Sequence, residues 1–161
     1  MKKETNVIKN AMGRALSGEG AHVEGARIFQ GMDWKLAGVL PAGVPHTVFQ
    51  LLNHVTYWQE WGVKWLDGRK PALPRSAALS WPGRPAPLAA REWEQGIKRF
   101  QAALENLQEH CGSDLLVSGG QKTRLEMLQT IASHNSYHLG QVALLRQMLG
   151  VWPPPGGGLT W

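Results

Sequence analysis

The sequence has little of what marks secreted or membrane proteins. Its single cysteine, Cys111, excludes an internal disulfide and suits a reducing cytoplasm. No apolar run approaches the roughly 20 residues that a transmembrane helix needs. The opening segment, MKKETNVIKNAMGRAL, is basic but has no continuous apolar stretch, so no signal peptide is expected. These absences predict a cytoplasmic protein that does not enter a membrane.

Charged side chains are also sparse, at 18% of the 161 residues, and the net charge is +5. The basic residues stand singly or in pairs, such as Lys2–Lys3 and Arg69–Lys70, and no arginine-rich helix or zinc-finger spacing occurs. A solvated basic surface explains this pattern better than a nucleic-acid interface. With 43% hydrophobic residues, the chain has the size and composition of one globular domain spanning residues 1–161.

Apolar residues recur at helical spacing, and no segment shows the alternation of a strand. The proline-rich residues 67–87 predict a long connection without a helix of its own, and residues 151–161 predict an extended tail. Long amphipathic helices joined by loops predict an all-α four-helix bundle. The expected helices span residues 4–17, 21–32, 46–66, 88–110 and 123–149.

The helix over residues 46–66 has clear signals at both ends. Thr47 is a candidate N-cap, and Gln50 stands at the position of its capping-box partner. Asp67 and Gly68 close the helix, since glycine suits the left-handed conformation after a helix end. The sequence therefore predicts a well-defined long helix here.

Histidine spacing points to chemistry. His134 and His138 are four residues apart, which is about 400° around a helix, so both rings share a face. That face also carries Ile131 and Val142, which directs the pair toward the bundle core. On the helix over residues 46–66, His54 shares a stripe with Leu51 and three tryptophans and should face inward too.

Three inward histidines without acidic partners would be costly as cations but suit neutral metal ligands. Three protein nitrogens would leave a coordination position open, as in catalytic metal sites. The alternative is a set of hydrogen-bonded core histidines. The pattern is not HExxH, because Asn135 follows His134, and the nearby acids Glu60 and Glu126 fall off the histidine stripe. A metal-bound water would then have to supply any hydrolytic nucleophile.

Other side chains are secondary candidates. Gln141 and Tyr137 could orient a ligand or a bound water, although an interhelical hydrogen bond explains Gln141 equally well. Trp58, Trp61 and Trp65 could wall a substrate pocket, although core packing is the simpler interpretation. His46 is interpreted as a helix-start residue, His22 and His110 as structural, and Cys111 as an ordinary thiol. Loop cations could attract a carboxylate-bearing thiol cofactor: Arg69, Lys70, Arg75 and Arg84.

Three segments together resemble the DinB-like superfamily of bacterial metal-binding four-helix proteins, which includes YfiT-type hydrolases. The stretch GEGAHVEGARIFQGMDWKLAGVLPAGVPHTVFQLLNHVTYWQ resembles the family's first half, HNSYHLGQVALLRQMLG its histidine signature, and GVWPPPGGGLTW the tail of one subgroup. The resemblance implies that His54, His134 and His138 are the metal ligands. It also implies a down-up-up-down bundle and frequently a homodimer.

The resemblance further implies a divalent ion, Zn or Ni being favoured, and a small-molecule substrate. Some relatives transfer sulfur from low-molecular-weight thiols, and others are regarded as hydrolases. Function is therefore expected to be metal-dependent S-transfer or hydrolysis, the alternative being a non-catalytic metal-binding or stress-related protein on the same scaffold. Fold and ligands do not choose among these.

Overall fold

The computed structural model describes residues 2–118 and 121–158. Across these residues the regular structure is helical, with one isolated bridge between Ser118 and Thr123. The predicted all-α class is confirmed. In chain order the elements are α1 (Lys2–Ser17), α2 (Trp34–Ala37), α3 (Val48–Leu66), the 3-10 helix η1 (Ala77–Ser80), α4 (Ala90–His110) and α5 (Arg124–Met148).

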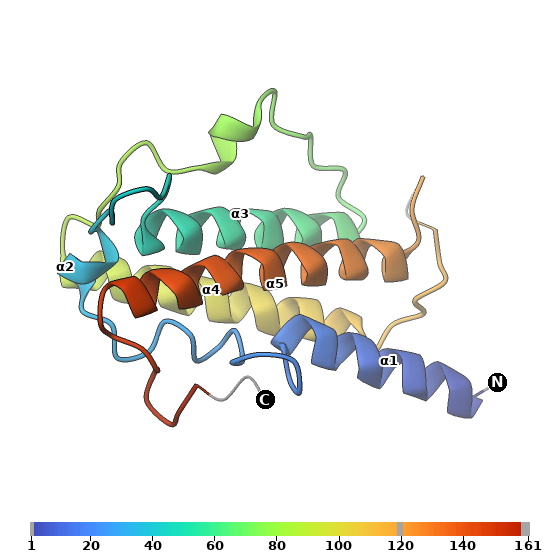
Figure 1. The fold of residues 1–161 in the computed structure, drawn as a ribbon. Helices are drawn as coiled ribbons and strands as arrows, with labels where there is room; N and C mark the ends of the chain where they lie inside the picture. The colour runs from blue at the N-terminus through green and yellow to red at the C-terminus, as the bar shows by residue number, and fades with distance from the viewer. Residues whose placement is uncertain (1, 119–120, 159–161) are drawn as a thin grey trace.

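The four long helices form a down-up-up-down bundle (Figure 1). Helices α1 and α5 run in one direction, and α3 and α4 run in the other. Both α1 and α3 pack against α4 and α5. Because α3 and α4 are parallel, the chain must travel back along the bundle between them, a distance of about 28 Å for the 19 residues of α3. Residues 67–89 make this return, and we call them the strap.

Capping boxes fix where the two helices of the histidines begin. Thr47 accepts from the backbone N–H of Gln50, and the Gln50 side chain accepts from the backbone of Thr47, as the sequence predicts. Thr123 and Glu126 do the same at the start of α5. The Thr47 hydroxyl also donates to the carbonyl of Pro85, 2.5 Å away, and so ties the strap to the start of α3.

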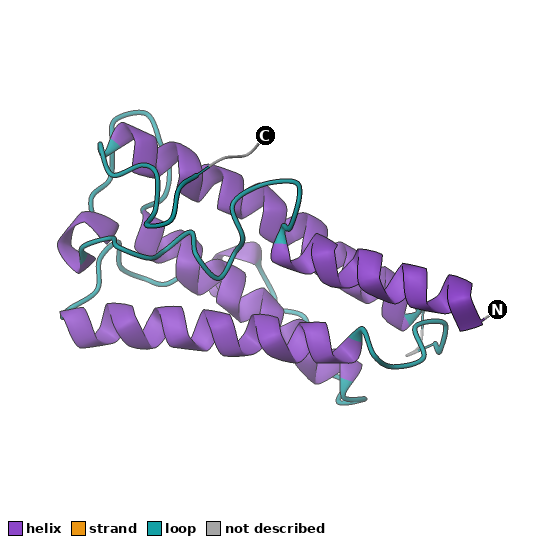
Figure 2. Ribbon diagram, turned by 90° about the horizontal axis from the view of Figure 1, so that it is seen from below, coloured by secondary structure: helices purple, strands orange, loops and turns teal. Residues whose placement is uncertain are grey.

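The predicted helix over residues 21–32 is wrong. These residues form consecutive turns, and the only helix before α3 other than α1 within the described residues is the short α2. Gly31 has a positive φ, which an α-helix does not contain, and Gly18 and Gly20 just before this range have positive φ values as well. The apolar residues that imitate a helical stripe, Ile28 and Phe29 among them, are buried as an irregular segment against the long helices (Figure 2).

Side chains of α4 and α5 donate hydrogen bonds to the irregular segment, and Arg146 of α5 makes the most of them. Arg146 is 1% exposed. Its Nη1 donates to the carbonyls of Ile28 (2.8 Å) and Gln30 (3.0 Å), and its Nε and Nη2 donate to that of Val151. Burial lowers the pKa of this guanidinium. One side chain therefore anchors both the segment before α2 and the start of the tail.

Two smaller expectations are modified. The strap is not wholly irregular, because it contains η1. The described part of the tail, residues 151–158, has no helix, as its prolines require, but it turns at Pro154–Gly157 and is not extended throughout. The predicted tail residues 159–161 lie outside the described residues.

Replacing Arg146 should destabilise the fold strongly. In Arg146→Met, the buried carbonyl of Ile28 and the part-buried carbonyls of Gln30 and Val151 lose their donor, so the free energy of unfolding should fall by about 2 kcal/mol or more. Urea denaturation measures this. The exposed Arg91 offers a matched control, and Arg91→Met should change stability by less than about 0.5 kcal/mol. Equal effects of the two substitutions would contradict the anchoring role.

Candidate metal centre

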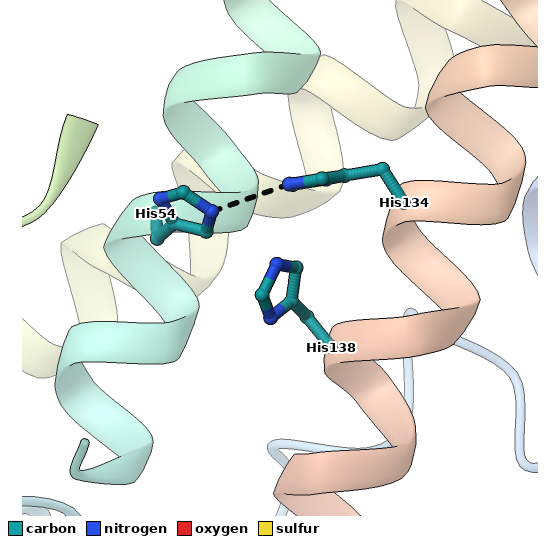
Figure 3. Close-up of side chains that lie close together, drawn as sticks. All are labelled: His54, His134 and His138. Carbon is teal, nitrogen blue, oxygen red and sulfur yellow. Dashed lines mark hydrogen bonds between the residues drawn. The ribbon is translucent and has the colours of Figure 1, made fainter. Parts of the chain in front are cut away.

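Three histidines converge between α3 and α5 (Figure 3). His54 projects from α3, while His134 and His138 project from successive turns of α5 toward it. His54 and His138 are 6% and 7% exposed, and His134 is half-buried. The sequence-based prediction that all three rings face inward is confirmed.

The spacing of the ring nitrogens fits one small cation. Nε2 of His134 lies 3.2 Å from Nε2 of His54, and one nitrogen from each of the three rings lies within 4.8 Å of the others. Two nitrogens bound to a tetrahedral zinc at about 2.0–2.1 Å are roughly 3.3 Å apart. The cluster therefore has the donor set and the dimensions of a divalent-metal site.

Hydrogen bonds at Nδ1 of His54 and His138 direct the Nε2 atoms of both rings toward the shared space. Nδ1 of His138 lies 2.7 Å from Oε1 of Gln141, and Nδ1 of His54 lies 3.3 Å from the carbonyl oxygen and 3.1 Å from Oγ of Ser80. Ser80 Oγ already donates to Ala77, so both Ser80 oxygens act as acceptors. Since carbonyl oxygens only accept, His54 and His138 carry their protons on Nδ1 and their lone pairs on Nε2.

The third ring lacks such a partner. Nδ1 of His134 is buried and makes no hydrogen bond within the described residues. Because Nε2 of His54 is an acceptor, Nε2 of His134 donates the hydrogen bond that joins the two rings. An ion would replace this shared proton and shift the proton of His134 to Nδ1.

Burial keeps the rings neutral. Burial, with added repulsion from His138, lowers the pKa of His54 to about 4. The same two causes, with His54 as a third, lower the pKa of His134 to about 3. Burial also lowers the pKa of His138, against the opposing effect of Gln141. Neutral imidazoles are the form that binds metal, so the cluster is ready for an ion at pH 7.

The strap covers the centre with groups that the sequence did not reveal. Besides Ser80, it supplies Trp81, whose indole stacks on the His54 ring at 3.8 Å between centroids. The same indole stacks on His46 at 3.7 Å. His46, interpreted from sequence as a helix-start residue, therefore belongs to the surroundings of the centre. The spacing of residues in the sequence did not indicate these contacts, because Ser80 and His54 are 26 residues apart and only the folded strap brings them together.

The secondary candidates from the sequence differ in how close they lie to the three histidines. Gln141 contacts His138 directly. Tyr137 is 67% exposed and presents its ring to the edge of His138 from outside, so it is not an inward group. Trp58 meets the His134 ring at 6.2 Å. Trp58 and Trp61 also line a cavity of about 320 Å³, together with Trp65, Leu73 and residues of α5, and a role of this cavity in binding a substrate stays a prediction.

The carboxylates considered from sequence are engaged elsewhere. Glu60 pairs with Arg99 at 2.8 Å, and Glu126 caps α5. In the strap, Arg69 pairs with Asp67, and Arg84 pairs with Glu92.

The remaining histidines and the cysteine also have other surroundings. His22 bonds to Ser136 and His110 to Asp67, so both have the structural contacts expected of them. Cys111 is buried, and burial raises the pKa of its thiol. It is therefore an ordinary thiol, as expected.

Comparison with known proteins identifies a family. The family model described as the DinB superfamily matches residues 27–142, a range that includes all three histidines of the centre. Neither the curated proteins nor the solved structures yield a match. Within the described residues, no helix is both long and apolar enough to cross a membrane.

Loss of stability in acid should begin near pH 6.5 in the metal-free protein, before most carboxylates titrate. In the unfolded chain His54 and His134 bind protons near pH 6.5, but in the folded chain only near pH 4 and 3. Proton uptake therefore favours unfolding as the pH falls from about 6.5 to 4. Urea midpoints measured in EDTA across this range should decline. The double variant His54→Leu/His134→Leu should decline less, and an equal decline would contradict the assignment.

Proposed function

The chain belongs to the DinB superfamily, and we propose on that premise that it is a metalloenzyme whose divalent ion is held by His54, His134 and His138. The observation that carries the proposal is the meeting of three neutral imidazoles around one small space between α3 and α5. When bound, such an ion supplies Lewis-acid chemistry, lowering the pKa of a water molecule or thiol and polarising a carbonyl oxygen. Zinc and nickel both suit three imidazole donors.

The protein's own contribution is to hold the donors in place. Ser80 and Gln141 fix the tautomers of His54 and His138 and keep their Nε2 lone pairs directed at the shared space. Trp81 covers one face of His54 and excludes water from it. Two ligands come from one helix and the third from a helix packed against it, so the spacing of the donors follows from rigid elements rather than loops.

The reaction that fits three protein donors is the activation of a thiol or a water toward an electrophile, giving S-transfer or hydrolysis. Three nitrogens leave room at the ion for one further group. A low-molecular-weight thiol would be the cosubstrate in the first case. The second candidate is a non-catalytic metal-binding protein. Glu60 is paired with Arg99 and Glu126 caps α5, so neither carboxylate is free to act as a base at the centre, which favours this candidate.

Purified without a histidine tag, the protein should hold one divalent ion per chain. Gln141→Leu should weaken zinc binding by about 10–100-fold, because the His138 tautomer loses its support. His134→Ala should weaken it further. Elemental analysis and competition with a chromophoric chelator measure these effects, and His110→Ala is the control. Metal content far below one ion per chain, not restored by added zinc or nickel, would refute the proposal.

A catalytic role predicts metal-dependent turnover. The zinc- or nickel-loaded protein should conjugate a thiol to an alkyl halide, or cleave an ester, at least about 100-fold faster than the EDTA-treated protein. His134→Ala should remove this difference while remaining folded by circular dichroism. If the loaded protein binds metal fully yet accelerates neither reaction, the non-catalytic candidate gains support.

A further inference from the structure

A small cavity of about 200 Å³ lies beside the metal centre, on the side away from the tryptophan-walled cavity. It is lined from α3 by Leu51 and from α5 by Gln141, Leu144 and Leu145, with Val44, Pro45 and His46 closing it. Leu51 precedes His54 by three residues, and Gln141 follows His138 by three. The cavity is therefore about one helical turn, roughly 5 Å, from both ligands.

The size and lining of the cavity select a compact aliphatic group. At about 30 Å³ for each water-sized group, the volume holds roughly seven such groups, fewer than a drug-sized ligand needs. Five of the seven lining residues are apolar, and none carries a fixed charge. The two polar residues are His46 and Gln141, and the Oε1 of Gln141 is already engaged by His138. The N–H donors left to recognise a ligand are therefore those of His46 and of the amide Nε2 of Gln141.

The His46 ring is held rigidly. Its plane is 14° from that of Trp81, and the plane of His54 is 6° from the same indole. Two rings at these short distances cannot share one face, so Trp81 lies between His46 and His54. Thr47, the next residue, is completely buried and caps α3, which fixes the backbone that carries His46.

The surroundings of His46 determine which nitrogen carries its proton. Nδ1 is buried and has no hydrogen-bond partner within the described residues. Nε2 makes no hydrogen bond within the described residues either, but it is not fully buried. A buried N–H without an acceptor is costlier than a buried lone pair, so the proton belongs on Nε2. Burial lowers the pKa of His46, which keeps the ring neutral. The ring therefore presents one N–H donor on its accessible side.

We propose that this cavity takes the short aliphatic chain of a carbonyl compound, an ester, thioester or amide, whose carbonyl oxygen accepts a hydrogen bond from Nε2 of His46. His46 is thus a specificity-determining residue. The proposal deepens the proposed function, on which it rests for the reaction, because the cavity lies about one helical turn from His54 and His138. Binding itself requires only the cavity and His46.

The test uses isobutyramide, an unreactive carbonyl compound of matching size, on the metal-free full-length protein. Titration followed by NMR of the tryptophan indole N–H signals should show saturable binding that shifts the Trp81 signal. Isobutylammonium, which has no acceptor, should bind at least about tenfold more weakly. His46→Phe keeps a ring to stack on Trp81 but loses the donor, and should weaken isobutyramide binding by about fivefold.

The conservative variant separates recognition from mere packing. His46→Gln replaces the ring but keeps an N–H near the position of Nε2, and should bind isobutyramide within about twofold of the unchanged protein. Leu144→Trp should fill the cavity and abolish binding. Unchanged affinity in His46→Phe or in Leu144→Trp, or shifts confined to Trp58 and Trp61, would overturn the proposal.

Metal binding is measured on the same variants. Zinc affinity should be unchanged within about twofold in His46→Phe and in Leu144→Trp, because neither residue is a proposed ligand. Isobutyramide binding to a protein that holds no metal would support the cavity proposal while the proposed function failed. Loss of zinc affinity in His46→Phe would overturn the assignment of His46 to substrate recognition.

Discussion

The parallel packing of α3 and α4 is the constraint on which the rest of this structure depends. It obliges the chain to return along the bundle, and the strap that makes this return runs along the outer side of α3 (Figure 1). This course delivers Ser80 and Trp81 to His54 and links Pro85 to the cap of α3. A short antiparallel connection between α3 and α4 would have left the histidines open to solvent. The topology thus supplies both the shielding of the centre and part of its hydrogen bonding.

Shielding has an electrostatic consequence. Water would stabilise protonated imidazoles, whereas burial beside two other rings disfavours charge on each of them. The folded protein therefore holds three neutral imidazoles close together. A metal cation could bind their lone pairs jointly, whereas a proton on one ring is disfavoured by burial. In the metal-free state the Nε2 atoms of His134 and His54 share one proton in a hydrogen bond. These same Nε2 atoms are the donors that an ion would use in place of that proton.

Sequence reasoning succeeded where the controlling interactions are local. Thr47 with Gln50 marks the start of α3, and the four-residue spacing of His134 and His138 fixes their common face, because both depend only on helical geometry. It failed over residues 21–32. There the positive φ of Gly31 and hydrogen bonds from Arg146, more than a hundred residues later, stabilise an irregular segment instead of a helix. Ser80 and Trp81 were not predicted, and His46 was interpreted only as a helix-start residue, for the same reason: tertiary packing places the strap that brings them together.

The three histidines and the two cavities lie at different places along α3 and α5. The ligands stand on these two helices, and one cavity adjoins them on each side, aliphatic beyond Gln141 and tryptophan-walled beyond Trp58. Each cavity is closed by residues outside the two helices: His46 and its neighbours at one end, and Leu73 of the strap at the other. Substitutions in these closing segments can alter what fits beside the centre without moving a ligand, because the helices alone set the donor spacing. The strap and the residues before α3 therefore shape the space beside the three histidines, while α3 and α5 set the spacing of the rings.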